Sequence, residues 1–263
     1  MTHYIQSALA PLRTQPDPSA ECVDEALHGM SVQLIPKMYQ LDCVDNAWHY
    51  VETDYRYRGW VQSAHLCAIS TTAKARNTPP THYVNVPTAD VLVAPKVQSP
   101  SVCMLTRGAL VWAYETKNGY QRVGLADGQS GYIRAAFCVA LSPVDKATVH
   151  EAAVQTALTY LGTQYRWGGK SPLGIDCSGL CFMAYWLHGV TLFRDARIEA
   201  GFAAKAVAGL SMAEDAQRGD LLYFPGHIGM YLGDGDMVHS SEAGNGVRVE
   251  RVPWERCTAV GRV

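Results

Sequence analysis

Two kinds of hydrophobic pattern divide the chain near residue 146. Before that point, short runs of β-branched and aromatic residues alternate with turn residues, which is typical of short β-strands. After it, residues 146–162 are rich in alanine, and apolar side chains recur at helical spacing up to Gly162, a favourable residue for ending a helix. The pattern predicts a β-rich first part and a second part that contains helices.

The β-rich part contains the same pattern twice, within residues 12–70 and 91–142. Each copy has a short strand-like run ending in proline, a second run after a glycine, and an aromatic strand after a further glycine. Repetition at spacings of 72 to 79 residues indicates an internal duplication. We expect two small β-barrels, at residues 1–72 and 80–143. The corresponding positions are Leu12 and Val91, Gly29 and Gly108, Gly59 and Gly131, and Trp60 and Tyr132.

The second part, residues 146–263, predicts helices followed by antiparallel strands, so the expected class is α+β. Residues 177–189 are apolar on nearly all sides, which indicates a central helix. A third helix is expected within Arg197 to Leu210. The strands are expected in the runs GDLLYF, HIGMYL, MVHSS and VRVERV.

Composition narrows the possible partners. The chain has 263 residues, of which 48% are hydrophobic and 17% charged, as expected of a protein with a substantial core. A net charge of −2 without a basic run argues against nucleic-acid binding. No apolar stretch is long enough to cross a membrane. The N-terminal residues lack the features of an export signal, so a cytoplasmic location is expected, or a periplasmic or secreted one if a signal was removed.

The eight cysteines are spread along the chain without a CxxC pair, so neither a disulfide framework nor a zinc site is expected, and no cofactor is implied. One of them stands out. Asp176 is a favourable helix N-cap, which places Cys177 in the first turn of the predicted central helix. Because the free N–H groups and the helix dipole stabilise negative charge there, Cys177 is expected to be an ionised nucleophile.

Two histidines follow this cysteine, as in papain-like cysteine hydrolases. His227 and His239 lie on either side of Gly233-Asp234-Gly235, which predicts a hairpin. In a hairpin, the residue numbers of two cross-strand partners add up to the same sum for every pair. A loop centred on Gly233 or on Asp234 places both histidines on the same face of the sheet, whereas a two-residue Asp234-Gly235 turn would not.

Together, these motifs resemble the NlpC/P60 family of cysteine peptidases over roughly residues 147–263. The matching residues are Tyr165, Trp167-Gly168-Gly169, Asp176-Cys177-Ser178-Gly179-Leu180, Gly219-Asp220-Leu221, Tyr223-Phe224, His227-Ile228-Gly229-Met230-Tyr231 and Val238-His239-Ser240. The resemblance implies a papain-like fold. It also implies that Cys177 is the nucleophile, His227 the base, His239 the residue that orients the base, and Tyr165 a donor to the oxyanion. Asp176 and Ser178 would line the substrate site. Trp167 is expected to pack beneath its loop.

The two β-rich repeats resemble bacterial SH3 (SH3b) domains. With them, the chain is similar to three-domain family members that are γ-D-glutamyl-L-diamino acid endopeptidases acting on murein-derived peptides. In those members a glutamate and a tyrosine of the first SH3b domain hold the free α-amine of the N-terminal L-Ala. By motif position these are Glu21 and Tyr57, with Asp17, Glu25 and Tyr55 as alternatives. Ala196 stands where some members have a serine.

Two other functions remain open at this stage. The chain could hydrolyse intact peptidoglycan with SH3b units as wall anchors, or act as a papain-like amidase or acyltransferase. A non-catalytic wall-binding protein is a further class, against which the complete set of Cys177, His227 and His239 argues. The identity of the diamino acid, the source organism and the oligomeric state are not indicated by the sequence.

Overall fold

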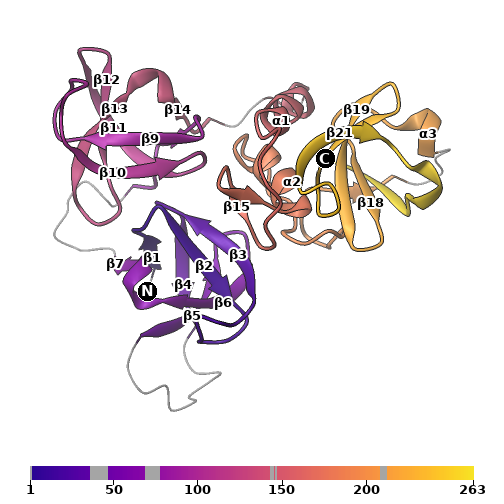
Figure 1. Ribbon diagram of the computed structural model, residues 1–263, viewed down its shortest axis with the longest axis horizontal. Helices are drawn as coiled ribbons and strands as arrows, with labels where there is room; N and C mark the ends of the chain where they lie inside the picture. Colours follow the sequence, from indigo (N-terminus) through magenta and orange to yellow (C-terminus); the bar gives the residue numbers. More distant parts are fainter. Residues whose placement is uncertain (1, 36–46, 69–77, 143–144, 146, 208–211) are drawn as a thin grey trace. The chain divides into compact units, whose positions relative to one another are not determined.

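The computed structural model describes residues 2–35, 47–68, 78–142, 145, 147–207 and 212–263 (Figure 1). The chain divides into two compact units, Met1–Leu141 and Ser142–Val263. Neither unit has, among its described residues, a helix that is long and apolar enough to cross a membrane.

The first unit contains two antiparallel sheets with the same strand order. The first sheet runs β3-β2-β6-β5-β4-β1-β7 and the second β10-β9-β13-β12-β11-β8-β14, so each strand of one sheet has a counterpart seven places later (Figure 1). This identity of topology agrees with the internal duplication. The strands are β1 (Thr2–Ile5), β2 (Leu9–Arg13), β3 (Cys22–Leu27), β4 (Ser31–Leu34), β5 (Trp48–Thr53), β6 (Arg58–Gln62), β7 (Leu66–Ala68), β8 (His82–Val84), β9 (Thr88–Leu92), β10 (Ser101–Thr106), β11 (Leu110–Lys117), β12 (Tyr120–Gly124), β13 (Ser130–Arg134) and β14 (Cys138–Ala140).

Two pairs of glycines show why the repeats share a sequence pattern. Gly29 and Gly108 have φ angles of 77° and 87°, a region that favours glycine. Gly59 and Gly131 let neighbouring strands approach closely. A Cβ at Gly59 would lie 3.0 Å from the Cβ of Leu12, and one at Gly131 would lie 2.6 Å from a methyl group of Val91. The two repeats therefore have the same local backbone requirements at matching positions.

Neither sheet closes into a barrel within the described residues. In the first sheet β3 and β7 are the edge strands, and in the second β10 and β14 are. The expectation of two closed small barrels is therefore not met. Each sheet still curls around apolar side chains, and in the second sheet the buried core includes Val91, Leu105, Val111, Val123 and Ile133.

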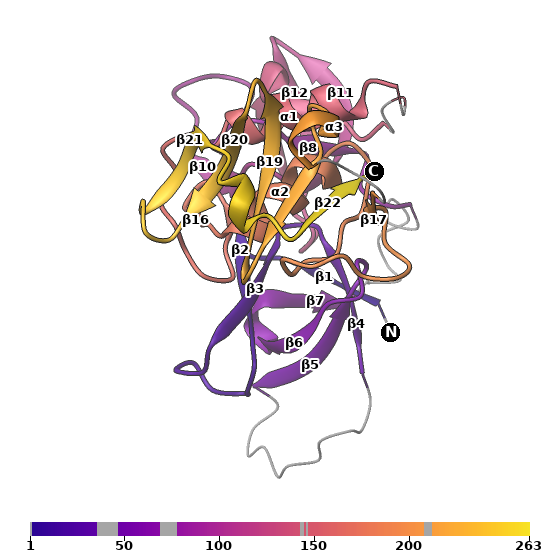
Figure 2. The same cartoon turned by 90° about the vertical axis from the view of Figure 1, so that its right-hand side faces the viewer.

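The second unit combines the helices α1 and α2 and the short helix α3 with a six-stranded antiparallel sheet of order β17-β22-β18-β19-β20-β21 (Figure 2). The central helix α2 packs against α1 and against β19 and β20 of the sheet. Its side chains are buried on nearly all sides, as its apolar sequence indicated. The elements are α1 (Val149–Leu158), β15 (Lys170–Ser171), β16 (Gly174–Ile175), α2 (Cys177–Trp186), β17 (Lys205–Ala206), α3 (Met212–Asp215), β18 (Leu221–Phe224), β19 (His227–Gly233), β20 (Asp236–Ser241), β21 (Gly246–Arg251) and β22 (Ala259–Arg262).

One predicted helix is wrong. Residues 197–207 form bends, turns and the short strand β17, and residues 208–210 of the predicted helix lie outside the described residues. Lys205 and Ala206 pair with Arg262 and Gly261 of β22, so pairing with the sheet edge overrides the helical preference of the alanine-rich sequence. The described chain is thus mostly β, with more strand than the α+β expectation suggested.

Candidate active site

The start of helix α2 is held by Asp176. Its side chain is the N-cap, with Oδ1 accepting a hydrogen bond of 2.6 Å from the backbone N–H of Gly179. Oδ2 accepts a second one of 2.8 Å from Gly168. Gly179 also has no room for a side chain, because a Cβ there would lie 2.2 Å from the carbonyl oxygen of Gly169. These contacts fix Cys177 as the first residue of the helix.

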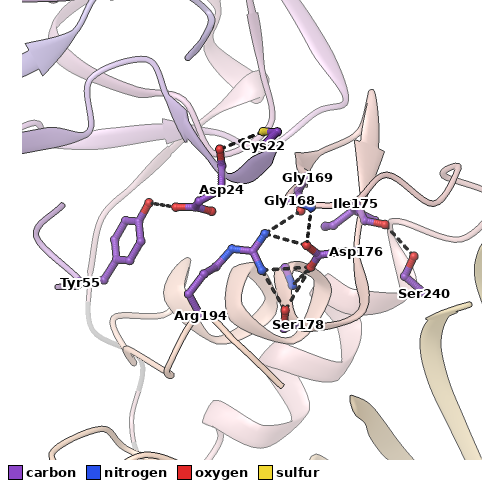
Figure 3. Close-up of polar contacts among 11 residues, drawn as sticks. Cys22, Asp24, Tyr55, Gly168, Gly169, Ile175, Asp176, Ser178, Arg194 and Ser240 are labelled. Atoms are coloured by element: carbon purple, nitrogen blue, oxygen red, sulfur yellow. Dashed lines mark hydrogen bonds and ion pairs between the residues drawn. The ribbon is translucent and has the colours of Figure 1, made fainter. Parts of the chain in front are cut away.

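A buried arginine completes this arrangement (Figure 3). Arg194, which is 2% exposed, donates from Nη1 to Oδ1 of Asp176 at 3.0 Å and from Nη2 to Oδ2 at 2.9 Å. It also donates to Oγ of Ser178 at 2.8 Å. Asp176 and Ser178, expected at the substrate site, are therefore both buried and engaged in holding the helix start. Sequence reasoning missed Arg194, because no spacing rule links it to a residue eighteen positions earlier.

The Cys177 thiol is buried, and burial is the main influence on its acidity. The pKa of Cys177 is raised to about 11, mainly by burial and next by the negative charge of Asp176, against the lowering effect of backbone hydrogen bonds from Ile228 and Ser178. This direction of the pKa shift runs against the expectation of a thiolate at rest and favours a neutral thiol in the free site. The hydrogen bond from Ile228 ties the sulfur to β19, the strand that begins at His227.

The hairpin that carries the histidines has the two-residue turn that, without a bulge, would place the two histidines on opposite faces. Gly233 pairs with Asp236 across a two-residue Asp234-Gly235 turn, in which both central residues have positive φ angles of 54° and 80°. A register shift between Tyr231 and Gly233 then restores the pairing. Met230 lies opposite Val238, and both histidines face the same side of the sheet. The prediction about the face was right, although the loop differs.

The two histidine rings and a glutamate form a chain of hydrogen bonds. Nε2 of His227 lies 2.7 Å from Nδ1 of His239, and Nε2 of His239 lies 3.0 Å from Oε2 of Glu250. Because an ionised carboxylate only accepts, His239 donates to it from Nε2, and its Nδ1 must accept from His227. His227 therefore carries its proton on Nε2, and its Nδ1 is a proton acceptor. Sequence reasoning missed Glu250, which lies opposite Met237 on the neighbouring strand.

The base is neutral over a wide pH range. Burial lowers the pKa of His227 to about 4, with His239 and Arg256 as smaller lowering influences and Glu250 as a raising one. Burial also lowers the pKa of His239, partly offset by its hydrogen bond to Glu250. A neutral imidazole can accept the proton of a neutral thiol, which is what a general base does for its nucleophile.

Tyr165 and Trp167 lie on the loop before this helix. Tyr165 forms a bridge to Ile175, and burial is the first cause that raises the pKa of its hydroxyl. Negative charge at Cys177 is the second cause, so the hydroxyl lies within electrostatic reach of the sulfur. Trp167 is 60% exposed, so the expectation that it packs beneath the loop is wrong.

An open cavity of about 540 Å³ begins at these residues. Tyr165, Trp167, His227 and His239 form part of its wall. The cavity also has charged walls, which include Glu242, Glu250, Arg251 and Arg256. Among the described residues, no group of three histidine, cysteine, aspartate or glutamate side chains is arranged to hold a metal ion.

Glu21 and Tyr57 lie in the first unit. Glu21 is exposed and immediately precedes β3, while Tyr57 is partly buried and precedes β6. The backbone N–H of Tyr57 donates to Oγ1 of Thr53 at 2.9 Å, which fixes this turn. Tyr55, one of the alternatives that the sequence left open, is buried and donates at 2.5 Å to the buried carboxylate of Asp24, a residue that sequence reasoning did not consider (Figure 3).

Comparison with known proteins identifies the family. The NlpC/P60 family model matches residues 162–259, which contain the helix start and both histidines. Dipeptidyl-peptidase 6 of Lysinibacillus sphaericus is 42% identical over 261 residues, which cover 95% of this chain and 91% of that protein. The chain belongs to the NlpC/P60 family. As a member of this family of cysteine peptidases, it is an enzyme whose chemistry fits the thiol and imidazole described above.

Two further relatives extend the comparison. A γ-D-glutamyl-L-lysine dipeptidyl-peptidase of Bacillus subtilis is 35% identical over 141 residues, covering 51% of this chain and 45% of that protein. The crystal structure of an NlpC/P60 family protein from Bacillus cereus is 24% identical and covers 100% of this chain and 99% of its own, with a TM-score of 0.81. That likeness shows that the fold is shared.

Proposed function

We propose that this NlpC/P60 peptidase hydrolyses the bond between γ-D-Glu and an L-diamino acid in murein-derived peptides that have a free N-terminal L-Ala. The observation that carries the proposal is Cys177 at the start of α2, bound by the backbone of Ile228, together with a base, His227, whose tautomer is set by His239 and Glu250. The names of the relatives from L. sphaericus and B. subtilis, a dipeptidyl-peptidase and a γ-D-glutamyl-L-lysine dipeptidyl-peptidase, support the choice of bond.

The proposed reaction follows from the proton positions. Nδ1 of His227 takes the proton of the Cys177 thiol as sulfur attacks the γ-carbonyl carbon. The backbone N–H of Cys177 and the hydroxyl of Tyr165 donate hydrogen bonds to the developing oxyanion. His227 then gives its proton to the departing amine as the C–N bond breaks, leaving a thioester on Cys177. Water, deprotonated by His227, releases the acid and restores the thiol.

His239 and Glu250 act on this reaction through His227. By accepting the Nε2 proton of His227, His239 keeps the imidazole in the orientation and tautomer of a base, as the aspartate does in a serine triad. Asp176 and Ser178 contribute by fixing the position of Cys177 together with Arg194. Direct contact of Asp176 and Ser178 with the substrate is a further part of the proposal.

The first unit is proposed to supply the specificity for a free amine. We assign its two sheets as SH3b-like domains over residues 1–72 and 80–143, an assignment supported by their identical strand order. Glu21 and Tyr57 are the proposed ligands of the L-Ala ammonium, because a carboxylate and an aromatic face both attract a cation. A requirement for this ammonium would restrict the enzyme to released peptides, since the L-Ala amine of intact murein is an amide.

The deciding experiment compares two peptides. L-Ala-γ-D-Glu-diaminopimelate and its N-acetylated form are incubated with the enzyme, and the products are identified by mass spectrometry. We expect L-Ala-D-Glu and free diaminopimelate from the first peptide and at least about tenfold slower cleavage of the second, as for loss of a hydrogen bond to a charged group. Glu21→Ala should slow cleavage of the free-amine peptide only, and Cys177→Ala should abolish cleavage of both.

Two outcomes would change the proposal. Cleavage at another bond would remove the γ-D-glutamyl assignment. Equal cleavage of free and acetylated peptides would indicate a hydrolase of intact peptidoglycan, with the first unit as a wall anchor.

A further inference from the structure

Two charged side chains in the cavity beside His227 have no ion-pair partner among the described residues. These are the carboxylate of Glu242 and the guanidinium of Arg256, both exposed and both part of the cavity wall. The other charges there are engaged: Glu250 binds His239 and Arg248, and Arg251 binds Asp236. Two opposite charges left available in one cavity fit a ligand that itself carries both signs.

The reaction indicates which part of the substrate lies in this cavity. His227 must hand its proton to the departing amine, so the residue after the cleaved bond lies on the side of His227. The cavity has His227 and His239 in its wall, and its size falls within the range of roughly 300–1,000 Å³ typical of ligand pockets. Under the proposed function, the departing residue is a diamino acid, which carries an ammonium on its side chain and, at a peptide C-terminus, an α-carboxylate.

The signs of the two charges decide how this residue is oriented. The guanidinium of Arg256 attracts the α-carboxylate and repels the ammonium, and the carboxylate of Glu242 does the reverse. Both side chains belong to the same cavity wall as His227. The departing residue therefore lies with its α-carboxylate towards Arg256 and its side-chain ammonium towards Glu242.

We infer that the cavity beside His227 is the binding site for the departing diamino acid, with Arg256 facing its α-carboxylate and Glu242 its side-chain ammonium. This inference rests on the proposed function and adds to it the two residues that would select the leaving residue by charge. Nothing in the reaction itself requires either side chain, so both act on specificity.

The test compares substrates that each lack one charge. The peptides are L-Ala-γ-D-Glu-L-Lys, the same peptide with an acetylated lysine side chain, and the same peptide with a C-terminal carboxamide. For each, kcat/KM is measured with the full-length enzyme. We expect each modification to lower kcat/KM of the wild type about tenfold, the effect of losing one charge-assisted hydrogen bond.

Variants then assign each charge to its partner. Glu242→Gln should abolish the discrimination against the acetylated side chain and keep the discrimination against the carboxamide. Arg256→Gln should do the reverse. Because each readout is a ratio between two peptides, a general effect of Arg256 on the pKa of His227 cancels. Glu255→Gln and Arg134→Gln change exposed charges outside the cavity wall and should leave both ratios unchanged.

The outcomes separate the inference from the proposed function. Cleavage at the γ-D-Glu bond with ratios that Glu242→Gln and Arg256→Gln leave unchanged would overturn the inference alone. Absence of cleavage at that bond in every peptide would overturn the proposed function and the inference with it.

Discussion

At Cys177, the two effects that set the acidity of a thiol at a helix start oppose each other. The helix start stabilises negative charge, yet the sulfur is buried next to the carboxylate of Asp176, and the net effect is a pKa raised to about 11. The nucleophile is thus made reactive by its base at the moment of attack. His227 can serve in this way because burial keeps it neutral.

This pairing predicts the pH dependence of the enzyme. As the pH falls through about 4, His227 of the free enzyme becomes protonated and can no longer accept the thiol proton, so kcat/KM should fall there and stay high above it. Rate measurements from pH 3 to pH 8 with the tripeptide substrate check this. A loss of activity already below pH 6 would contradict a base of such low pKa. In a separate measurement, His227→Ala should slow the alkylation of Cys177 by iodoacetamide at pH 7.

Glu250 provides a second test at this scale. Its carboxylate makes His239 donate from Nε2 and raises the pKa of His227, so Glu250→Ala should lower kcat about tenfold and move the acid limb to lower pH. His239→Gln should be milder than His227→Ala, because an amide oxygen can still accept the proton of His227. An unshifted acid limb in Glu250→Ala would show that Glu250 does not act through His227.

At the scale of elements, the start of α2 is held by ionic contacts more than by helix preference. Arg194 donates to both carboxylate oxygens of Asp176, and both residues are buried. Asp176 in turn binds the backbone of Gly168 and Gly179, so one carboxylate joins the preceding loop to the helix. The position of Cys177 therefore depends on a residue that takes no part in the chemistry.

Replacing Arg194 should lower the free energy of unfolding. Arg194→Met leaves the Asp176 carboxylate buried without its counter-ion, and we expect a loss of about 3–5 kcal/mol in the free energy of unfolding. Urea denaturation of both proteins measures it. Arg197→Met is the matched control, because Arg197 is exposed and its ion pairs with Asp195 and Glu199 lie at the surface, so it should change stability by less than about 1 kcal/mol. Similar losses for both variants would contradict the role of Arg194.

At the scale of the whole molecule, the duplicated sheets of the first unit are joined by a buried histidine. His28 binds the carbonyl of Gln6 through Nδ1 at 2.8 Å and accepts from the backbone N–H of Ala126 at 3.1 Å. Its own carbonyl accepts from Leu110 at 2.7 Å. The rings of Tyr4 and Trp112 pack edge to face and form an apolar cluster with Ala126. The sheets are therefore joined by directed hydrogen bonds as well as by apolar contact.

His28 should accordingly matter for the first unit. His28→Leu leaves the buried N–H of Ala126 and the carbonyl of Gln6 without these partners, at a cost of about 1–3 kcal/mol for each. Hydrogen exchange at the Ala126 amide should become faster. His49→Leu, a change to a partly buried histidine within one sheet, should leave that exchange rate unchanged. Unchanged exchange in His28→Leu would show that other contacts hold the sheets together.

The sequence by itself determined the features that depend on local pattern. The duplication was readable because each repeat needs glycine at the same backbone positions, and the start of α2 because an N-cap aspartate precedes an apolar run. The pairing of His227 and His239 on one face followed from the two-residue period of strands. Local helix preference gave a wrong prediction for residues 197–207, because Lys205 and Ala206 pair with β22.

Only the tertiary structure decided the features that arise from residues distant in the chain. Arg194 and Glu250 gained their roles from side chains that the fold brings next to them, and no spacing in the sequence signals either contact. The raised pKa of the Cys177 thiol is also a result of the tertiary structure. The effect of the helix start is local and visible in the sequence, whereas the burial that outweighs it exists only after the sheet has packed against the helix.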